Sequence, residues 1–347
     1  MNQTKNSDYC TIRDLLETSG DLAVMTIITR KGSTPRLPGT RMLVTRDGRR
    51  FGTVGGGFCE ADAVRAAEEC LASKKSCILQ YSSVPGSTLP SDIICGGSLE
   101  ILVEYLPADP YHLRLISDFV QLQGLRQTPV MIVPLPGDSE SDRVRCFIGP
   151  DGLVRGISPG IHHPQVLEAA REMKRPGVFQ AGEVQFLIEP GPLKSRLVIC
   201  GAGYIAAETA PLASHLGFEV SVLDDRDDLL NADVYRGTGR VPVTSYESCL
   251  QALPVDAATG ILIVTRSHAF DLQVLRQALR TPAGYIGMIG SRHKWKTLSS
   301  RLLEEGLGED DLKRVHCPVG LEIGADSPEE IAVSIAAELI GYRALQQ

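Results

Sequence analysis

Two glycine-rich loops near the start of the chain have the residue types of an anion-binding site. Both lie in the stretch 32–60, where they bracket a short apolar strand at 42–44. The second loop, three consecutive glycines, leads into a segment with helical periodicity near Glu60. Glycine lets backbone N–H groups approach a ligand, and a helix start favours negative charge. The same glycines would also serve if they only let the chain turn into its helix. We expect a phosphate-bearing small molecule to bind Arg36, Arg41, Gly55, Gly56 and Gly57.

A cysteine followed by two glycines, Cys95-Gly96-Gly97, is the second candidate site. It directly precedes an apolar strand predicted at 99–106. Flanking glycines leave a thiol accessible, so a thiolate here could contact a ligand or a metal ion. A lone cysteine before glycines is also compatible with a structural role, and Cys59, at the start of the predicted helix, is interpreted as a packing residue.

The third candidate site is a dinucleotide-type glycine turn, Gly201-x-Gly203, with Ala206 at the third position of the motif. It follows an apolar strand at 196–200 and opens a helix at 204–216, which is the context that a Rossmann fold requires. Asp224 and Asp225 end the next strand, where a ribose-binding acid belongs. Arg226 directly after them would soften discrimination against a 2′-phosphate. Glycines used only for tight packing are the alternative.

Polar residues also follow two later strands of this half. His268 and Asp271 come after the strand at 260–265 and are three residues apart at a helix start, so they could share a proton or a ligand. Ser291 and Arg292, together with Lys294, follow the strand at 283–289 and could bind an anion at a helix N-terminus. Residues past the carboxyl ends of parallel strands face the ligand crevice. Helix capping by Asp271 and Ser291, with the other side chains solvated, is the alternative.

The elements that must position these residues divide the chain into two parts. Residues 1–190 mix strands with a few helices and include a middle segment at about 107–190, whereas Gly191-Pro192 has the composition of a linker. Strands and helices alternate from 196 onward, a pattern typical of a parallel, doubly wound sheet. The predicted fold is therefore an N-terminal α+β domain, 1–190, followed by a Rossmann-like domain, 191–347.

Composition and charge exclude several classes of function. The 347 residues carry a net charge of −7, so nucleic-acid binding is not expected. No apolar run reaches the length of a membrane-spanning helix, and no membrane association is expected. Nine dispersed cysteines without a Cys-x-x-Cys pair are typical of free thiols in a cytoplasmic protein.

With these residues laid out, the chain resembles the xanthine dehydrogenase accessory family, XdhC/CoxI. The resemblance covers nearly the whole chain, although Cys59 and the middle segment depart from it. In the first half it rests on Gly32–Arg36, Gly39-x-x-Met42, Gly52-x-x-Gly55-Gly56-Gly57-x-x-Glu60 and Cys95-Gly96-Gly97. In the second half it rests on Cys200–Gly203, Asp224-Asp225-Arg226, Thr265-Arg266-x-His268-x-x-Asp271, Tyr285–Arg292, Pro318-x-Gly320-Leu321-x-Ile323-Gly324-Ala325 and Pro328–Glu338.

The resemblance implies a chaperone for the molybdenum cofactor, a phosphate-bearing pterin dithiolene (molybdopterin) that also occurs in a nucleotide form. Such a protein binds and protects the cofactor, supports its sulfuration with a cysteine desulfurase, and inserts it into the apoenzyme of a xanthine dehydrogenase-type molybdenum hydroxylase. Homodimers are expected. The cofactor would contact both glycine loops, Glu60 and the Rossmann crevice, and Cys95 would touch the metal.

Two other functions stay open on sequence. One is an NAD(P)-dependent oxidoreductase that uses the Gly201-x-Gly203 turn for the nicotinamide cofactor and His268 as acid/base. It gives no role to the triple-glycine loop, Gly55–Gly57, or to Cys95-Gly96-Gly97, so the chaperone is favoured and little catalysis is expected. The other is a scaffold that only bridges a desulfurase and a hydroxylase.

Overall fold

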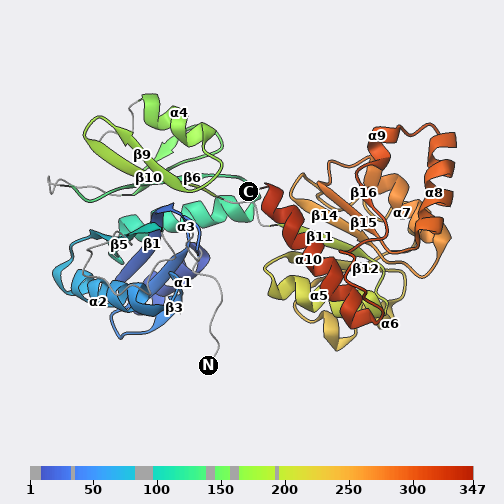
Figure 1. Cartoon of the computed structure of the whole chain (residues 1–347), viewed down its shortest axis with the longest axis horizontal. Helices are drawn as coiled ribbons and strands as arrows, with labels where there is room; N and C mark the ends of the chain where they lie inside the picture. The colour runs from blue at the N-terminus through green and yellow to red at the C-terminus, as the bar shows by residue number, and fades with distance from the viewer. Residues whose placement is uncertain are drawn as a thin grey trace. The chain divides into compact units, whose positions relative to one another are not determined.

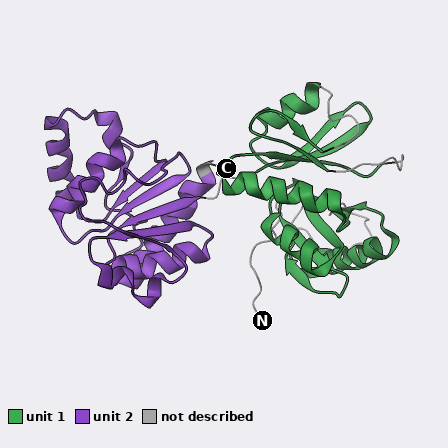
Figure 2. Cartoon of the chain, turned by 180° about the vertical axis from the view of Figure 1, so that it is seen from behind, with its two compact units in different colours: residues 1–193 green, residues 194–347 purple. Residues whose placement is uncertain are grey.

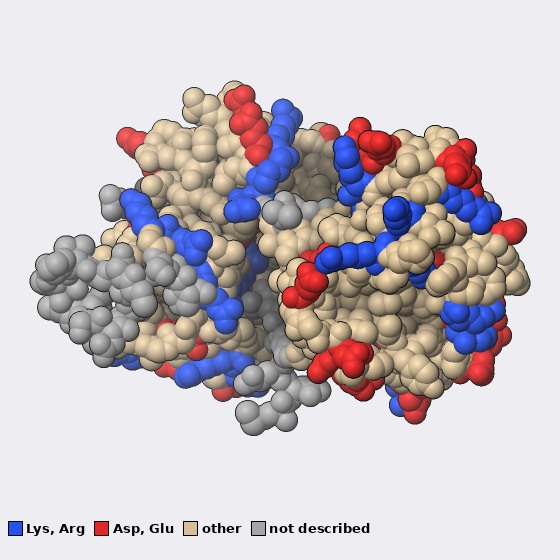
Figure 3. Space-filling model, turned by 45° about the vertical axis from the view of Figure 1, so that its right-hand side comes forward, with Lys and Arg blue, Asp and Glu red and all other residues tan. Residues whose placement is uncertain are grey.

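The computed structural model describes residues 9–32, 36–82, 97–137, 145–156, 164–191 and 195–346. The chain divides into two compact units, residues 1–193 and 194–347 (Figure 2). No described helix is both long enough and apolar enough to cross a membrane. On the face shown in Figure 3, lysine and arginine side chains lie interspersed with aspartate and glutamate.

The first unit begins with an antiparallel five-stranded sheet in the order β3-β2-β1-β5-β4. Strand β1 is central, and its first seven residues are all buried because both faces of the sheet are covered. Helix α2 packs on one face through its alanines and Val64, and α1 and α3 cover the other. The elements are α1 (Tyr9–Ser19), β1 (Leu22–Lys31), β2 (Arg41–Thr45), β3 (Arg50–Gly52), α2 (Gly57–Ser73), β4 (Cys77–Ser82) and β5 (Ser98–Leu106).

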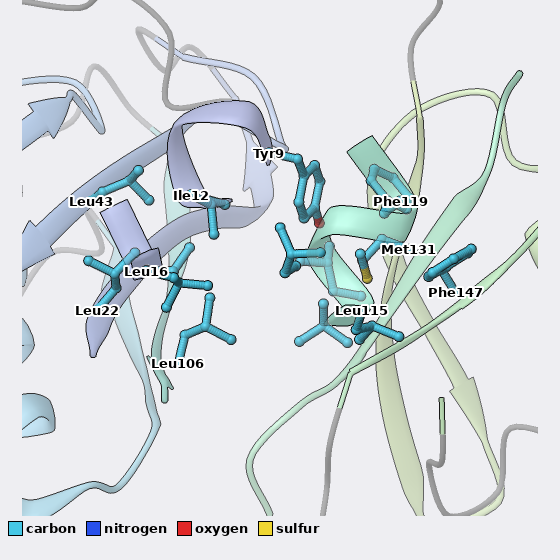
Figure 4. Close-up of a cluster of buried hydrophobic side chains, with 14 of the residues drawn as sticks. Tyr9, Ile12, Leu16, Leu22, Leu43, Leu106, Leu115, Phe119, Met131 and Phe147 are labelled. Atoms are coloured by element: carbon cyan, nitrogen blue, oxygen red, sulfur yellow. The ribbon is translucent and has the colours of Figure 1, made fainter. Parts of the chain in front are cut away.

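A second antiparallel sheet, in the order β8-β7-β6-β10-β9, completes the first unit. Helix α3 lies between the two sheets (Figure 1). One apolar cluster joins both sheets: Tyr9 of α1 packs on Phe119 of α3, and Phe119 packs on Phe147 of β7 (Figure 4). The elements are α3 (Pro110–Gly124), β6 (Val130–Pro134), β7 (Cys146–Ile148), β8 (Val154–Arg155), α4 (Pro164–Glu172), β9 (Gly177–Ala181) and β10 (Val184–Pro190).

The second unit is a six-stranded, wholly parallel sheet in the order β13-β12-β11-β14-β15-β16. This order confirms the predicted doubly wound fold and places the switch point between β11 and β14, at their carboxyl ends. Helices cover both faces (Figure 1). The elements are β11 (Arg196–Cys200), α5 (Tyr204–His215), β12 (Glu219–Asp224), α6 (Asp227–Leu230), η1 (Asp233–Tyr235), β13 (Gly239–Pro242), β14 (Thr259–Ile263), α7 (His268–Leu279), β15 (Tyr285–Met288), α8 (Arg292–Glu304), α9 (Glu309–Leu312), β16 (Val315–His316) and α10 (Pro328–Gln346).

Candidate functional site

The triple-glycine loop surrounds an anion that belongs to the protein itself. The carboxylate of Glu60 accepts hydrogen bonds from the backbone N–H groups of Val54, at 3.1 Å, and Gly56, at 3.0 Å. The hydroxyl of Thr53 donates to the same oxygen. Burial raises the pKa of Glu60, but these bonds outweigh it and hold the pKa below its ordinary value. Two of the amides that line this loop thus already have a carboxylate partner, and one of them belongs to a glycine that we expected to bind a ligand phosphate.

The geometry of the loop explains why it is built of glycine. Gly55, Gly56 and Gly57 all have positive φ, at 130°, 80° and 65°. Helix α2 begins inside the run, at Gly57, rather than near Glu60 as predicted, because these conformations let the chain turn sharply into the helix. A Cβ atom at Gly56 or Gly57 would meet nothing within 4 Å, so the outer side of the loop is open.

The two arginines beside the first glycine loop have different surroundings. Arg36 is exposed. Arg41 is buried and forms an ion pair with Glu189 of β10, and its guanidinium stacks over the Tyr9 ring at 4.6 Å from the centroid. The Tyr9 hydroxyl donates to the same carboxylate over 2.6 Å. The structure therefore gives Arg41 a partner between the two sheets, in place of the phosphate that the sequence suggested.

A second buried ion pair lies next to the first. Arg145 donates to both carboxylate oxygens of Glu104, on β5, and its Nη1 lies 3.4 Å from the Tyr9 hydroxyl. Two arginines, two glutamates and one tyrosine thus form a charge-balanced network inside the first unit. Burial lowers and the surrounding carboxylates raise the pKa of each arginine, and the carboxylates prevail, so both stay charged.

The cysteine–glycine site lies mostly outside the described residues. Cys95 and Gly96 are not described, and Gly97 directly precedes β5. Among the described residues, no group of three or more His, Cys, Asp or Glu side chains is arranged to hold a metal ion. Cys59 lies in the first turn of α2 and is buried in the core against the sheet, as predicted for a packing residue, and burial raises its pKa.

The Gly201-x-Gly203 turn lies at the carboxyl end of β11. The structure constrains its two glycines differently. Gly201 has φ +114°, and a Cβ there would collide with the backbone oxygen of Val264 at the end of β14. Gly203 caps α5 with φ −80°, a conformation open to any residue, and a Cβ there would meet nothing within 4 Å. The fold requires Gly201, whereas the fold alone does not require Gly203.

The two acids at the end of β12 are both occupied by arginines. Asp224 is fully buried and accepts bonds from the Ala202 N–H, at 2.7 Å, and from the backbone N–H, Nε and Nη2 of Arg226. Burial raises its pKa, but Arg226 and the Ala202 amide outweigh it and lower the pKa of Asp224 to about 2. Asp225 pairs in bidentate fashion with Arg266, which comes from the end of β14.

The pair His268–Asp271 predicted from the sequence does not form. His268 begins α7 and is exposed. Asp271 is buried, and its carboxylate accepts bonds from Thr265 and from Lys294 Nζ, the latter at 2.5 Å. Lys294 also donates to the carbonyl of Ile289. Side chains in the first turn of a helix point back toward its N-terminus, so the Asp271 carboxylate lies near the strand ends. There it meets Lys294 instead of His268.

Ser291 and Arg292 lie at the start of α8, as predicted, but each has a partner. The Ser291 hydroxyl accepts from the Lys294 N–H and caps the helix, and Arg292 pairs with Glu322 on the surface. The capping alternative thus describes Ser291. The sequence did not predict the ion pairs Lys294–Asp271 and Arg266–Asp225, although one signal was available. All four residues follow the carboxyl ends of strands of the same parallel sheet, β12, β14 and β15.

Comparison with known proteins matches both halves of the chain to family models. Residues 197–339 match the XdhC Rossmann domain, and residues 15–82 match the XdhC and CoxI family. A protein of Bacillus subtilis named as a probable xanthine dehydrogenase subunit is 27% identical over 336 residues, 95% of each protein. The molybdenum cofactor insertion chaperone PaoD of Escherichia coli is 23% identical, over 95% of this chain and 86% of PaoD.

Two further proteins are similar to this chain. The E. coli protein YqeB is 28% identical over 229 residues, which are 60% of this chain and only 42% of YqeB, so this chain matches less than half of that longer protein. A crystal structure described as a xanthine dehydrogenase from Bacillus halodurans is similar with a TM-score of 0.81 at 25% identity, and the match covers 99% of this chain and 97% of the other.

Proposed function

Because the chain belongs to the XdhC and CoxI family, we propose that it binds the molybdenum cofactor, protects it, and inserts it into a molybdenum hydroxylase of xanthine dehydrogenase type. The observation that carries this proposal is the similarity over 95% of the chain to PaoD, a molybdenum cofactor insertion chaperone. A match of that extent includes both units, so it reflects more than a shared Rossmann fold, which by itself would not indicate a function.

The residues of the second unit fit the polar end of such a ligand. The cofactor carries its own metal ligands, the dithiolene sulfurs, so the protein has to recognise the pterin and the phosphate. Helix α5 starts at Gly203 without a side-chain cap, which leaves the N–H groups of its first turn for an anion. Arg226 follows β12 and Arg266 follows β14, so both lie at the carboxyl edge of the same sheet.

The first unit, taken by itself, has its own candidate contacts for the cofactor. Arg36 is exposed beside the first glycine loop, and the outer side of Gly56 and Gly57 is open. In the proposed function, Arg36 and the glycine loop contact the cofactor, and the Cys95 thiol protects its metal. Arg41 is left out because Glu189 and Tyr9 already hold it.

A transfer assay tests this function. The purified chain is incubated with molybdenum cofactor, separated from unbound cofactor by gel filtration, and mixed with a cofactor-free xanthine dehydrogenase-type apoenzyme. We expect the chain to retain the cofactor and to activate the apoenzyme more efficiently than free cofactor does. Failure to retain the cofactor, with no effect on activation, would overturn the proposal.

We also propose a handover step that involves a cysteine desulfurase. Adding the desulfurase and cysteine before transfer should raise the fraction of active, sulfurated hydroxylase, and Cys95→Ala should lower it. An unchanged yield with Cys95→Ala would support a scaffold instead. The proposed homodimer is checked by light scattering on the same preparation.

The alternative, an NAD(P)-dependent oxidoreductase, has one observation in its favour, the glycine turn at the switch point of a Rossmann sheet. Two ion pairs argue against it. Asp271 pairs with Lys294 and so does not orient His268, the proposed acid/base. Asp224 already accepts four hydrogen bonds, from Ala202 and Arg226, which occupy the positions that a ribose hydroxyl would need. Titration with NADH and NADPH separates the two functions, because tight binding with turnover is expected only of the oxidoreductase.

A further inference from the structure

A loop of the second unit, residues 319–327, carries two exposed apolar side chains. Leu321 is 49% exposed and Ile323 is 55% exposed. Val333 of α10 is exposed as well, and it directly precedes Ser334, whose backbone oxygen accepts a hydrogen bond from the Leu321 N–H over 3.3 Å. Single exposed apolar residues are common on protein surfaces, whereas neighbouring ones mark an interaction site. Leu321, Ile323 and Val333 are called the apolar patch below.

Side chains of α10 fasten the first part of this loop. The Ser334 hydroxyl donates to the Leu321 backbone oxygen over 2.6 Å, and the Gly320 N–H donates to Glu338 over 2.6 Å. Glu338 is itself held, because the Tyr285 hydroxyl donates to it over 2.8 Å. Gly320 has a φ of 96°, and a Cβ atom there would collide with the Ser334 hydroxyl. The chain therefore passes close against α10 at this point.

The last part of the loop is fastened in the same way. The carboxylate of Glu330, in the first turn of α10, accepts hydrogen bonds from the N–H groups of Asp326, at 2.9 Å, and Ser327, at 3.3 Å. Both ends of the loop are thus held by polar groups of α10, while Leu321 and Ile323 face solvent. A surface that keeps one conformation loses little conformational entropy when a partner binds. The loop therefore has the properties of a preformed contact surface.

The charges around the apolar patch distinguish between its possible occupants. Four acids and no lysine or arginine lie between residues 321 and 333. Arg292 of α8 pairs with one of them, Glu322, so the surroundings of the patch remain negative. A second copy of the chain, related by a two-fold axis through the patch, would bring acids next to acids, and like charges across an interface repel. A partner with lysine or arginine around an apolar contact would be attracted instead.

The loop begins at the carboxyl edge of the parallel sheet. The Val319 N–H donates to the backbone oxygen of Met288, the last residue of β15, over 3.1 Å. The proposed function puts the polar end of the cofactor at this same edge of the sheet. We propose that the apolar patch is the docking surface for the apoenzyme, and that the apoenzyme contributes an apolar contact surrounded by basic side chains. That the partner is a molybdenum hydroxylase rests on the proposed function, whereas the chemistry of its surface rests on the patch and the acids around it.

Binding of the full chain to the cofactor-free apoenzyme of the transfer assay, measured by biolayer interferometry at low and at high salt, tests this surface. Leu321→Asn and Ile323→Asn should each weaken binding about tenfold or more, because each removes an apolar side chain from the centre of the contact. Glu329→Lys should slow association several-fold and reduce its dependence on salt, because it reverses one of the surrounding charges. All three variants should keep the melting temperature and the cofactor retention of the unaltered chain.

Leu303→Asn is the matched control. Leu303 is similarly exposed, at 42%, and lies in the same unit. It is about 16 Å along α8 from Arg292, the residue that pairs with Glu322 of the loop. The control should bind the apoenzyme as the unaltered chain does.

Several results would overturn the inference. Unchanged binding in both Leu321→Asn and Ile323→Asn, or faster association of Glu329→Lys, would contradict it. A lower melting temperature of Leu321→Asn and Ile323→Asn would show that these side chains pack within the chain. A homodimer that dissociates in Leu321→Asn, followed by light scattering, would assign the patch to a second copy.

The same experiment separates this inference from the proposed function. Retention of the cofactor without any binding to the apoenzyme would overturn the docking surface and leave cofactor binding standing. Binding to the apoenzyme that depends on Leu321 and Ile323, without retention of the cofactor, would do the reverse.

Discussion

Replacing Arg41 with methionine should destabilise the first unit without touching ligand binding. The change removes a buried cation from the Glu189 carboxylate, which is 4% exposed and keeps the hydrogen bond from the Tyr9 hydroxyl at 2.6 Å. Breaking a buried pair by removing one partner costs about 3–5 kcal/mol. With a urea dependence of about 2 kcal/mol per molar, the unfolding midpoint should fall by roughly 1.5–2.5 M.

The unfolding of the two units can be followed separately. Its single tryptophan is Trp295, in the second unit, so tryptophan fluorescence follows that unit while far-ultraviolet circular dichroism follows both. Arg41→Met should shift the circular dichroism transition and leave the fluorescence transition in place. The double variant Arg41→Met/Glu189→Leu should recover most of the loss, because two apolar side chains leave no charge uncompensated.

The result that would refute this reasoning is a loss below about 1 kcal/mol for Arg41→Met, or a double variant no more stable than the single one. Retention of the cofactor gives an independent check. Per folded molecule it should be unchanged in Arg41→Met and reduced in Arg36→Ala. A loss of retention in Arg41→Met, measured under conditions where the protein is folded, would restore Arg41 to the phosphate site.

Three further predictions concern single contacts. The pKa of Asp224 is about 2 in the folded protein and about 3.9 in the unfolded chain. Ionised Asp224 therefore contributes roughly 2.5 kcal/mol to the free energy of unfolding above pH 4, and this contribution is lost as the pH falls toward 2. Asp224→Asn should remove this pH dependence from unfolding followed by fluorescence. Glu60→Gln should destabilise the first unit by about 1–2 kcal/mol in urea titrations by circular dichroism, because the glycine loop loses a charged acceptor. Lys294→Met should lower the stability of the second unit, followed by fluorescence, by about 3–5 kcal/mol, because it leaves the buried carboxylate of Asp271 without its cation. A loss below about 1 kcal/mol in Glu60→Gln or in Lys294→Met would contradict the role given to that residue.

The fold class could be predicted from the sequence because local patterns suffice for it. Alternating apolar strands and helices, with a glycine turn after the first strand, specify a doubly wound parallel sheet. The partners of charged side chains could not be predicted in the same way. Arg41 and Glu189 are 148 residues apart, and no periodicity relates them.

Most of the charged residues that the sequence predicted as ligand contacts have partners within the protein. The ion pairs they form are of two kinds, buried and part-exposed. Arg41–Glu189 and Lys294–Asp271 are at most 10% exposed, so exchanging either partner for a ligand would leave a charge buried and unpaired. Asp225–Arg266 is part-exposed, at 21% and 38%, so water can replace a lost partner there at small cost. A protein that must release its cargo needs contacts that exchange. We therefore expect Arg266→Lys, which loses the bidentate geometry but keeps the charge, to change the rate of cofactor transfer more than the stability of the fold. Equal transfer rates for the variant and the unaltered chain would show that this ion pair has no part in release.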